Sequence, residues 1–95
     1  MTDPVDILVF HLVAALVRHG MDPEQARKDA EERVAVVLED LARSGAPVGI
    51  YLRRVRVYRL RCQGVQMQAI ADRLGIARET AHREYRAEML RRRAG

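Results

Sequence analysis

The chain has 95 residues, of which 48% are hydrophobic and 4% aromatic, and it contains no tryptophan. This length is enough for one domain or two small helical lobes, and the aliphatic content argues against disorder. A single cysteine, Cys62, excludes an internal disulfide, and Asp3 and Asp6 lie where a signal peptide would be basic. We therefore expect a protein of the reducing cytoplasm.

The formal net charge is +4, but the charge is segregated along the chain. Residues 1–52 hold five Lys or Arg against nine acids, a net charge of −4. Residues 53–95 hold twelve Arg against four acids, a net charge of +8. An arginine-rich genome would explain arginine in place of lysine, but not this segregation. The asymmetry predicts a polyanionic partner for the C-terminal half.

The first predicted helix starts at Asp3-Pro4, a capping acid followed by proline, and runs to Arg18 with Gly20 as its stop. Its apolar residues leave almost no polar face, which predicts burial on several sides. The helix is shorter than the roughly 20 residues that span a bilayer. Burial in a dimer interface, burial within the monomer and rest on a membrane surface are the alternatives. We favour the dimer, because so small a chain has little else to cover this helix.

A second helix starts at Asp22-Pro23 and is expected to continue to about Ser44. One apolar stripe runs along it: Ala26, Ala30, Val34, Val37 or Leu38, and Leu41. Its opposite face carries charges of both signs, as is typical of a solvated helix face. The two helices predict an antiparallel hairpin over residues 1–47, and two hairpins would form a four-helix dimer core.

Residues 48–52 (VGIYL) are short, extended in character and flanked by helix breakers. They predict either a short strand, paired with its copy across a two-fold axis, or an irregular linker. With this strand included, the residues assigned to dimerisation are Leu8, Phe10, Leu12, Val13, Leu16, Val17, Val37, Leu41, Ile50 and Tyr51.

The C-terminal segment, 53–95, is predicted to be a three-helix DNA-binding domain. Residues 53–63 (RRVRVYRLRCQ) fit a strand or a helix, and we expect a helix because a helix-turn-helix needs a third helix to bury its core. Residues 64–86 then show apolar positions at helical spacing on both sides of Gly75, with the small Ala71 four residues before it. Glycine takes the left-handed turn between two such helices without steric cost. This pattern is typical of a helix-turn-helix, whose second helix lies in the major groove of DNA.

The segment GVQMQAIADRLGIARETA resembles the helix-turn-helix of small phage and bacterial regulators, and it is similar to the C-terminal reader of serine recombinases. With residues 49–52 (GIYL) before it, the segment resembles most the Mor/C family of phage transcription activators. The resemblance implies a helical dimerisation domain, a short strand and a helix-turn-helix, in a phage-related activator with RNA polymerase as a candidate partner. Two residues depart from the pattern: Arg53 stands in place of proline, and Glu84 in place of an apolar residue.

Within the second helix of the motif, Ile76, Ala81, Tyr85 and Met89 are expected to point inward. The candidates for contact with base edges are therefore Arg78, Glu79, His82 and Arg83. Arginine can fork onto guanine, and glutamate can accept from cytosine. The simpler interpretation of these residues is solvated surface charge, and Glu79 could instead pair with Arg83 one helical turn away.

Phosphate-binding candidates surround this helix: Arg53, Arg54, Gln66, Gln68, Thr80 and Arg86. The three tyrosines, His11, His19 and Cys62 are interpreted as packing residues. No glycine-rich phosphate loop, metal-ligand spacing or nucleophile motif occurs in the sequence, so we expect no enzyme, no metal and no cofactor.

We therefore predict an all-α fold, allowing one short strand, and a homodimeric transcription regulator that binds double-stranded DNA and no membrane. The alternatives are an accessory protein of phage packaging or recombination, and a protein-interaction module in which the basic half is incidental.

Overall fold

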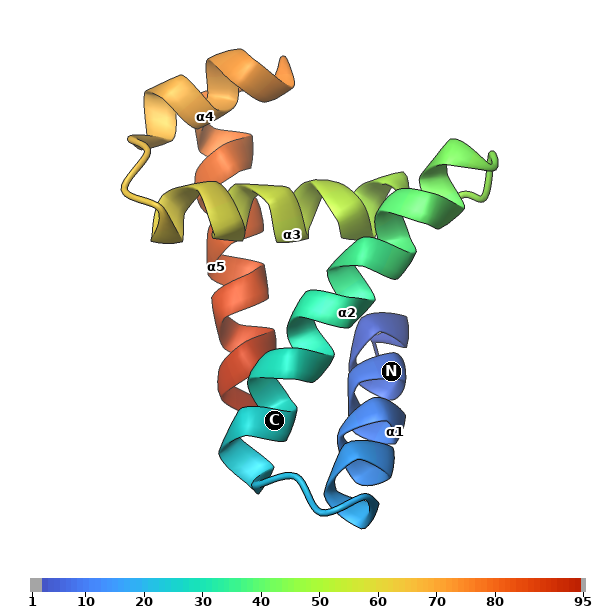
Figure 1. Ribbon diagram of the computed structural model, residues 1–95. Helices are drawn as coiled ribbons and strands as arrows, with labels where there is room; N and C mark the ends of the chain where they lie inside the picture. The colour runs from blue at the N-terminus through green and yellow to red at the C-terminus, as the bar shows by residue number, and fades with distance from the viewer. Residues whose placement is uncertain (1–2, 95) are drawn as a thin grey trace. The chain divides into compact units, whose positions relative to one another are not determined.

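The computed structural model describes residues 3–94, and every regular element in this part of the chain is an α-helix. The helices are α1 (Pro4–Arg18), α2 (Pro23–Arg43), α3 (Gly49–Cys62), α4 (Met67–Leu74) and α5 (Arg78–Ala94) (Figure 1). The all-α prediction is confirmed. The chain divides into two compact units after Ala46. The N-terminal unit contains α1 and α2, and the C-terminal unit contains α3, α4 and α5.

Both helices of the N-terminal unit start where the sequence predicts. Asp3 Oδ1 accepts a hydrogen bond of 2.8 Å from the backbone N–H of Val5. Asp22 Oδ2 accepts bonds of 3.1 and 3.3 Å from the N–H groups of Glu24 and Gln25. These bonds satisfy donors that the first turn of a helix leaves without partners. Helices α1 and α2 then pack against each other, running in opposite directions (Figure 1).

Of the alternatives for α1, burial within the monomer is wrong, while burial in a dimer interface stays a prediction. Only Val5 and Val9 are buried in this helix, while Phe10 is 69% exposed. In α2 the predicted stripe is buried at Ala26, Ala30, Val34 and Leu38. Further apolar side chains on the surface of this unit are Ile7, Leu8, Val17, Val36, Val37 and Leu41. The hairpin therefore buries one side of each helix and leaves apolar surface elsewhere.

Residues 48–52 form neither a strand nor an irregular linker, and both predictions for them are wrong. Helix α3 begins at Gly49, and the N–H of Leu52 donates to the carbonyl of Val48 at 3.0 Å. Leu52 and Val55, three residues apart, are buried on one helical side. A helix satisfies its backbone groups internally, whereas this segment would have needed a partner strand. The helical prediction for residues 53–63 is confirmed, with a start four residues earlier.

The C-terminal unit packs three helices around one apolar core. The buried residues of this core are Val57, Met67, Ile70, Ala71 and Ala81. Each of the three helices contributes at least one residue to it, and α5 crosses α3 steeply (Figure 1). The predicted inward residues Ile76 and Tyr85 pack against the same core. The small side chains of Ala71 and Ala81, 1% and 0% exposed, allow α4 and α5 to approach closely.

A three-residue connection, Gly75 to Ala77, joins α4 to α5. Gly75 has φ +65° and ψ +37°, the left-handed conformation that the sequence predicts at this position. The N–H of Ile76 donates to the carbonyl of Ala71 at 3.0 Å and closes the end of α4. Because the connection is so short, the start of α5 is held close to α4.

Candidate nucleic-acid interface

The start of α5 presents all four predicted base-reading side chains to solvent. Arg78, Glu79, His82 and Arg83 are exposed, while Ala81 between them is fully buried. Arg83 donates a hydrogen bond of 3.4 Å to Thr80 Oγ1 on the same helix. The buried side of α5 thus fixes which side chains face outward, as helical periodicity requires.

Residues from all three helices of the C-terminal unit line one open depression. Its volume is about 480 Å³, and it is lined by Arg61, Gln66, Met67, Gln68, Arg78 and His82. Arg61 comes from the last turn of α3, the two glutamines from the start of α4, and Arg78 and His82 from the start of α5. Predicted base-reading and phosphate-binding residues therefore line one surface.

Gln66 and Gln68 lie at the start of α4, where the first backbone N–H groups have no partners within the helix. Gln66 is the N-cap residue and does not cap the helix with its side chain. Gln68 Nε2 donates to Asp72 Oδ1 at 3.1 Å, which holds the amide along the helix surface. A helix start of this kind favours an anion, since the N–H groups and the helix dipole both present positive charge.

Arg61 is a member of this surface that the sequence analysis missed. In the sequence it is one of several arginines spaced along residues 53–61. Only the packing of α3 against α4 shows that Arg61 lies beside Gln66 and Gln68. Its position in the last turn of α3, two residues before the C-cap Gln63 and close in sequence to the start of α4, is the signal that would have identified it.

Arg53 and Arg54, predicted to bind phosphate, instead pair with carboxylates of α5. Arg53 Nη2 lies 2.7 Å from Glu84 Oε1, and Arg54 Nε lies 3.0 Å from Glu88 Oε1. Glu88 is completely buried and also accepts hydrogen bonds from Arg91 Nε at 2.8 Å and Arg92 Nε at 3.1 Å. We name Glu88, Arg54, Arg91 and Arg92 the arginine cluster. Arg54, Arg91 and Arg92 neutralise the buried Glu88, and Arg53 neutralises Glu84, so the charges of Arg53 and Arg54 are already balanced within the fold.

The arginine cluster also sets the protonation of Glu88. Burial by itself would raise the pKa of this carboxyl group. The hydrogen bond from Arg91 and the positive charges of Arg91 and Arg92 outweigh burial, so the pKa of Glu88 is lowered. Glu88 is therefore held as the anion.

The aromatic residues of the C-terminal unit pack within the fold, as expected. The rings of Tyr58 and Tyr85 stack with centroids 5.7 Å apart, and the Arg92 guanidinium lies 4.1 Å above Tyr58. Burial, followed by a hydrogen bond with Cys62, raises the pKa of Tyr58. The packing interpretation is wrong for Cys62 itself, which is exposed. His11 and His19 are also exposed and not packed at the edge of a core.

The remaining residues predicted to bind phosphate or to form the dimer differ in their exposure. Arg86 is exposed on α5, and Thr80 is partly buried. Of the predicted dimerisation residues, the exposed ones are Leu8, Phe10, Val17, Val37, Leu41 and Ile50. The partly buried ones are Leu12, Val13, Leu16 and Tyr51.

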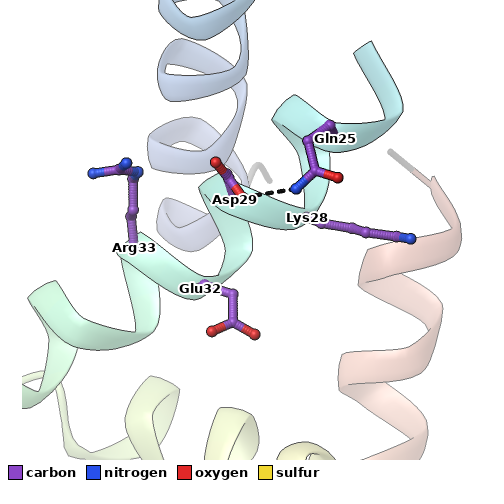
Figure 2. Close-up of a pocket in the computed structure, with 5 residues that line it drawn as sticks. All are labelled: Gln25, Lys28, Asp29, Glu32 and Arg33. Atoms are coloured by element: carbon purple, nitrogen blue, oxygen red, sulfur yellow. Dashed lines mark hydrogen bonds between the residues drawn. The ribbon is translucent and has the colours of Figure 1, made fainter. Parts of the chain in front are cut away.

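The charged face of α2 forms a second shallow depression, of about 370 Å³. Figure 2 shows its lining residues, Gln25, Lys28, Asp29, Glu32 and Arg33. Gln25 Nε2 donates to Asp29 Oδ1 at 3.0 Å along the same helix. Lys28 and Arg33 lie beside Asp29 and Glu32, so the charges in this depression balance, as on the solvated helix face that the sequence predicts.

Residues 3–94 contain no group of three His, Cys, Asp or Glu side chains that could hold a metal ion. None of the helices described there is long and apolar enough to cross a membrane. No family model, curated protein or solved structure matches the chain.

Proposed function

We propose that this protein is a homodimeric, sequence-specific DNA-binding regulator of transcription in which α4 and α5 act as a helix-turn-helix. The observation that carries the proposal is the surface around the 480 Å³ depression, where Arg61, Arg78 and His82 lie beside the start of α4. Such a surface offers one positively charged side to a DNA backbone while α5 projects side chains toward base edges.

Helix α5 is the proposed recognition helix. In a helix-turn-helix the residues at the start of the second helix contact bases in the major groove. Here those residues are Arg78, Glu79, His82 and Arg83, all exposed. Arginine forks onto guanine O6 and N7, and each such contact discriminates by about 1–3 kcal/mol against a wrong base.

The depression is the proposed contact for the DNA backbone. Gln66 and Gln68 carry amide donors at the start of α4, and Arg61 adds a positive charge beside them. Contacts of this type position the protein on the duplex and make binding dependent on salt. Arg86 is a further phosphate contact on the exposed side of α5.

Dimerisation is assigned to the N-terminal unit. The apolar side chains exposed on α1, of which Phe10 at 69% is the most exposed, are the support for a protein partner. Two reading heads would then bind half-sites about one helical turn, or a multiple of it, apart. We place this activity in the cytoplasm, at the nucleoid, with RNA polymerase as a further partner if the protein is an activator.

The test is selection of bound sequences from a random duplex pool at near-physiological salt. The native chain is compared with the double variant Arg78→Ala/Arg83→Ala and with the matched control Arg33→Ala/Arg43→Ala, whose residues are exposed on α2. We expect the native chain and the control to enrich the same two-part motif and the α5 variant to lose it.

Binding without enrichment would contradict sequence recognition and would favour an accessory role in DNA packaging or recombination. Equal enrichment by the α5 variant would show that another surface reads the bases. Circular dichroism of each variant establishes that its helices are intact, which the exposure of the substituted residues leads us to expect.

A further inference from the structure

Helix α1 has a second apolar side, away from the one that it buries. Ile7, Phe10 and Val17 are 45%, 69% and 39% exposed. Ala14, between them, is partly buried. These four residues are spaced by three, four and three positions, which places them on one side of a helix, roughly opposite the buried Val5 and Val9. We name them the outer α1 stripe.

We propose that the outer α1 stripe packs antiparallel against the same stripe of a second copy of this chain. The proposal rests on the homodimer of the proposed function and assigns the surface that forms it. A spacing of three and four residues is the pattern with which paired helices interlock side chains.

Side-chain size specifies the register of the pair. In an antiparallel pair centred between Phe10 and Ala14, each Phe10 faces Ala14 of the other copy, and each Ile7 faces Val17. The largest side chain of the stripe thus meets the smallest, which fills space without overlap. A parallel pair would place Phe10 against Phe10 and leave a gap where Ala14 meets Ala14.

Charge favours the same orientation. Asp3 and Asp6 lie at the start of α1, and Arg18 lies in its last turn. An antiparallel pair brings the acidic start of one helix to the level of Arg18 of the other copy, and it sets the helix dipoles in opposition. A parallel pair would align like charges and like dipole ends.

A second copy fits this surface better than a lipid bilayer does. Helices that lie in a membrane interface carry lysine and arginine on their polar side, which attract anionic lipids. Within residues 4–18 the only such residue is Arg18, and Asp6 opposes its charge. The charge of α1 therefore supports a protein partner.

Sedimentation equilibrium of the full chain tests the surface. We expect a species of twice 10.8 kDa that Phe10→Lys weakens at least about tenfold in Kd, because two buried phenylalanines are lost per dimer. The matched control is Val36→Lys, an exposed apolar residue of α2 with 57% exposure, which should leave Kd unchanged. Phe10 is so exposed that its replacement should preserve helicity.

Cysteine cross-linking tests the orientation. In a Cys62→Ser background, an isotopically labelled chain with Ile7→Cys is mixed with an unlabelled chain carrying Val17→Cys and oxidised. We expect disulfides between positions 7 and 17, identified by mass spectrometry. Links between two copies of position 7, or two of position 17, would overturn the antiparallel register.

The outcomes separate this inference from the proposed function. A monomer, or a dimer that Phe10→Lys does not weaken, overturns the inference, even if the selection experiment still returns a motif. A monomer that floats with phosphatidylglycerol vesicles, and loses this binding on Phe10→Lys, would overturn it in favour of lipid. A cross-linked antiparallel dimer that enriches no DNA motif would retain the inference and reject the regulator.

Discussion

The two units of this protein differ in the kind of side chain that they expose to solvent. The N-terminal unit carries a net charge of −4 and leaves apolar side chains such as Phe10 in solvent. The C-terminal unit carries +8, yet it buries two carboxylates, Glu84 and Glu88. Exposed apolar surface suits a protein partner, and exposed positive charge suits a polyanion. The two units therefore differ in the class of partner that their exposed surfaces favour.

The buried carboxylates explain how the C-terminal unit remains folded with so much positive charge. Like charges on a small domain repel and destabilise the compact state. Glu84 pairs with Arg53, and Glu88 accepts hydrogen bonds from Arg54, Arg91 and Arg92. Arginines therefore fall into two groups: those neutralised inside the fold, and those on the surface, such as Arg61 and Arg78.

The largest expected effect comes from breaking the arginine cluster. Glu88→Gln should lower the free energy of unfolding by about 3–5 kcal/mol, because three arginines would keep their charges after losing a buried partner. Unfolding in urea, followed by the near-ultraviolet dichroism of tyrosine, measures this, since all three tyrosines lie in the C-terminal unit. The control Glu79→Gln, at an exposed position of α5, should change stability by less than about 0.5 kcal/mol. Equal effects of the two variants would contradict the role of Glu88.

Lowering the pH should reduce part of the folding stability of the C-terminal unit. The pKa of Glu88 is lower in the folded protein than in the unfolded chain, because Arg91 and Arg92 outweigh the effect of burial. The group therefore stabilises the fold above the unfolded pKa, and this stability is lost as pH falls through the folded pKa. Urea titrations between pH 7 and pH 3 should show this loss in the tyrosine signal. Glu88→Gln should lose less stability over the same range, and an unchanged slope would contradict the assignment.

These two predictions concern Glu88, a residue to which the sequence by itself assigns no role. Helical periodicity and capping are local, so the starts at Pro4 and Pro23 and the glycine turn at Gly75 follow from the sequence. The start of α3 does not follow from the sequence, because Val48 offers no capping side chain and residues 50–52 have strand character. Its helical state depends on the burial of Leu52 and Val55, which is a tertiary effect.

For the candidate site, too, the sequence predicts what depends on local periodicity and not what depends on tertiary packing. The exposed side of α5 follows from its buried side, so the sequence predicts the exposure of four side chains: Arg78, Glu79, His82 and Arg83. Whether Arg53, Arg54 and Arg61 are paired or exposed depends on the helix against which each side chain packs. A run of arginines in the sequence contains no local mark that separates the paired ones from the exposed ones. Only the packing of α3 against α4 and α5 makes that distinction.

The smallest expected effect tests the distinction between paired and exposed arginines. Arg61→Ala should weaken DNA binding only a few-fold and equally for all sequences, because a phosphate contact carries no base preference. The slope of log affinity against log salt should become shallower by about 0.9, the value for one neutralised phosphate. Two controls separate position from charge: Arg59→Ala, exposed on α3 outside the depression, and Arg43→Ala, which removes an exposed ion pair with Asp40 in the N-terminal unit. Both should leave the salt slope unchanged, since neither residue lies on the proposed interface. If Arg59→Ala or Arg43→Ala changed the slope as much as Arg61→Ala does, the DNA would be attracted by net charge alone, and the depression would lose its assigned role.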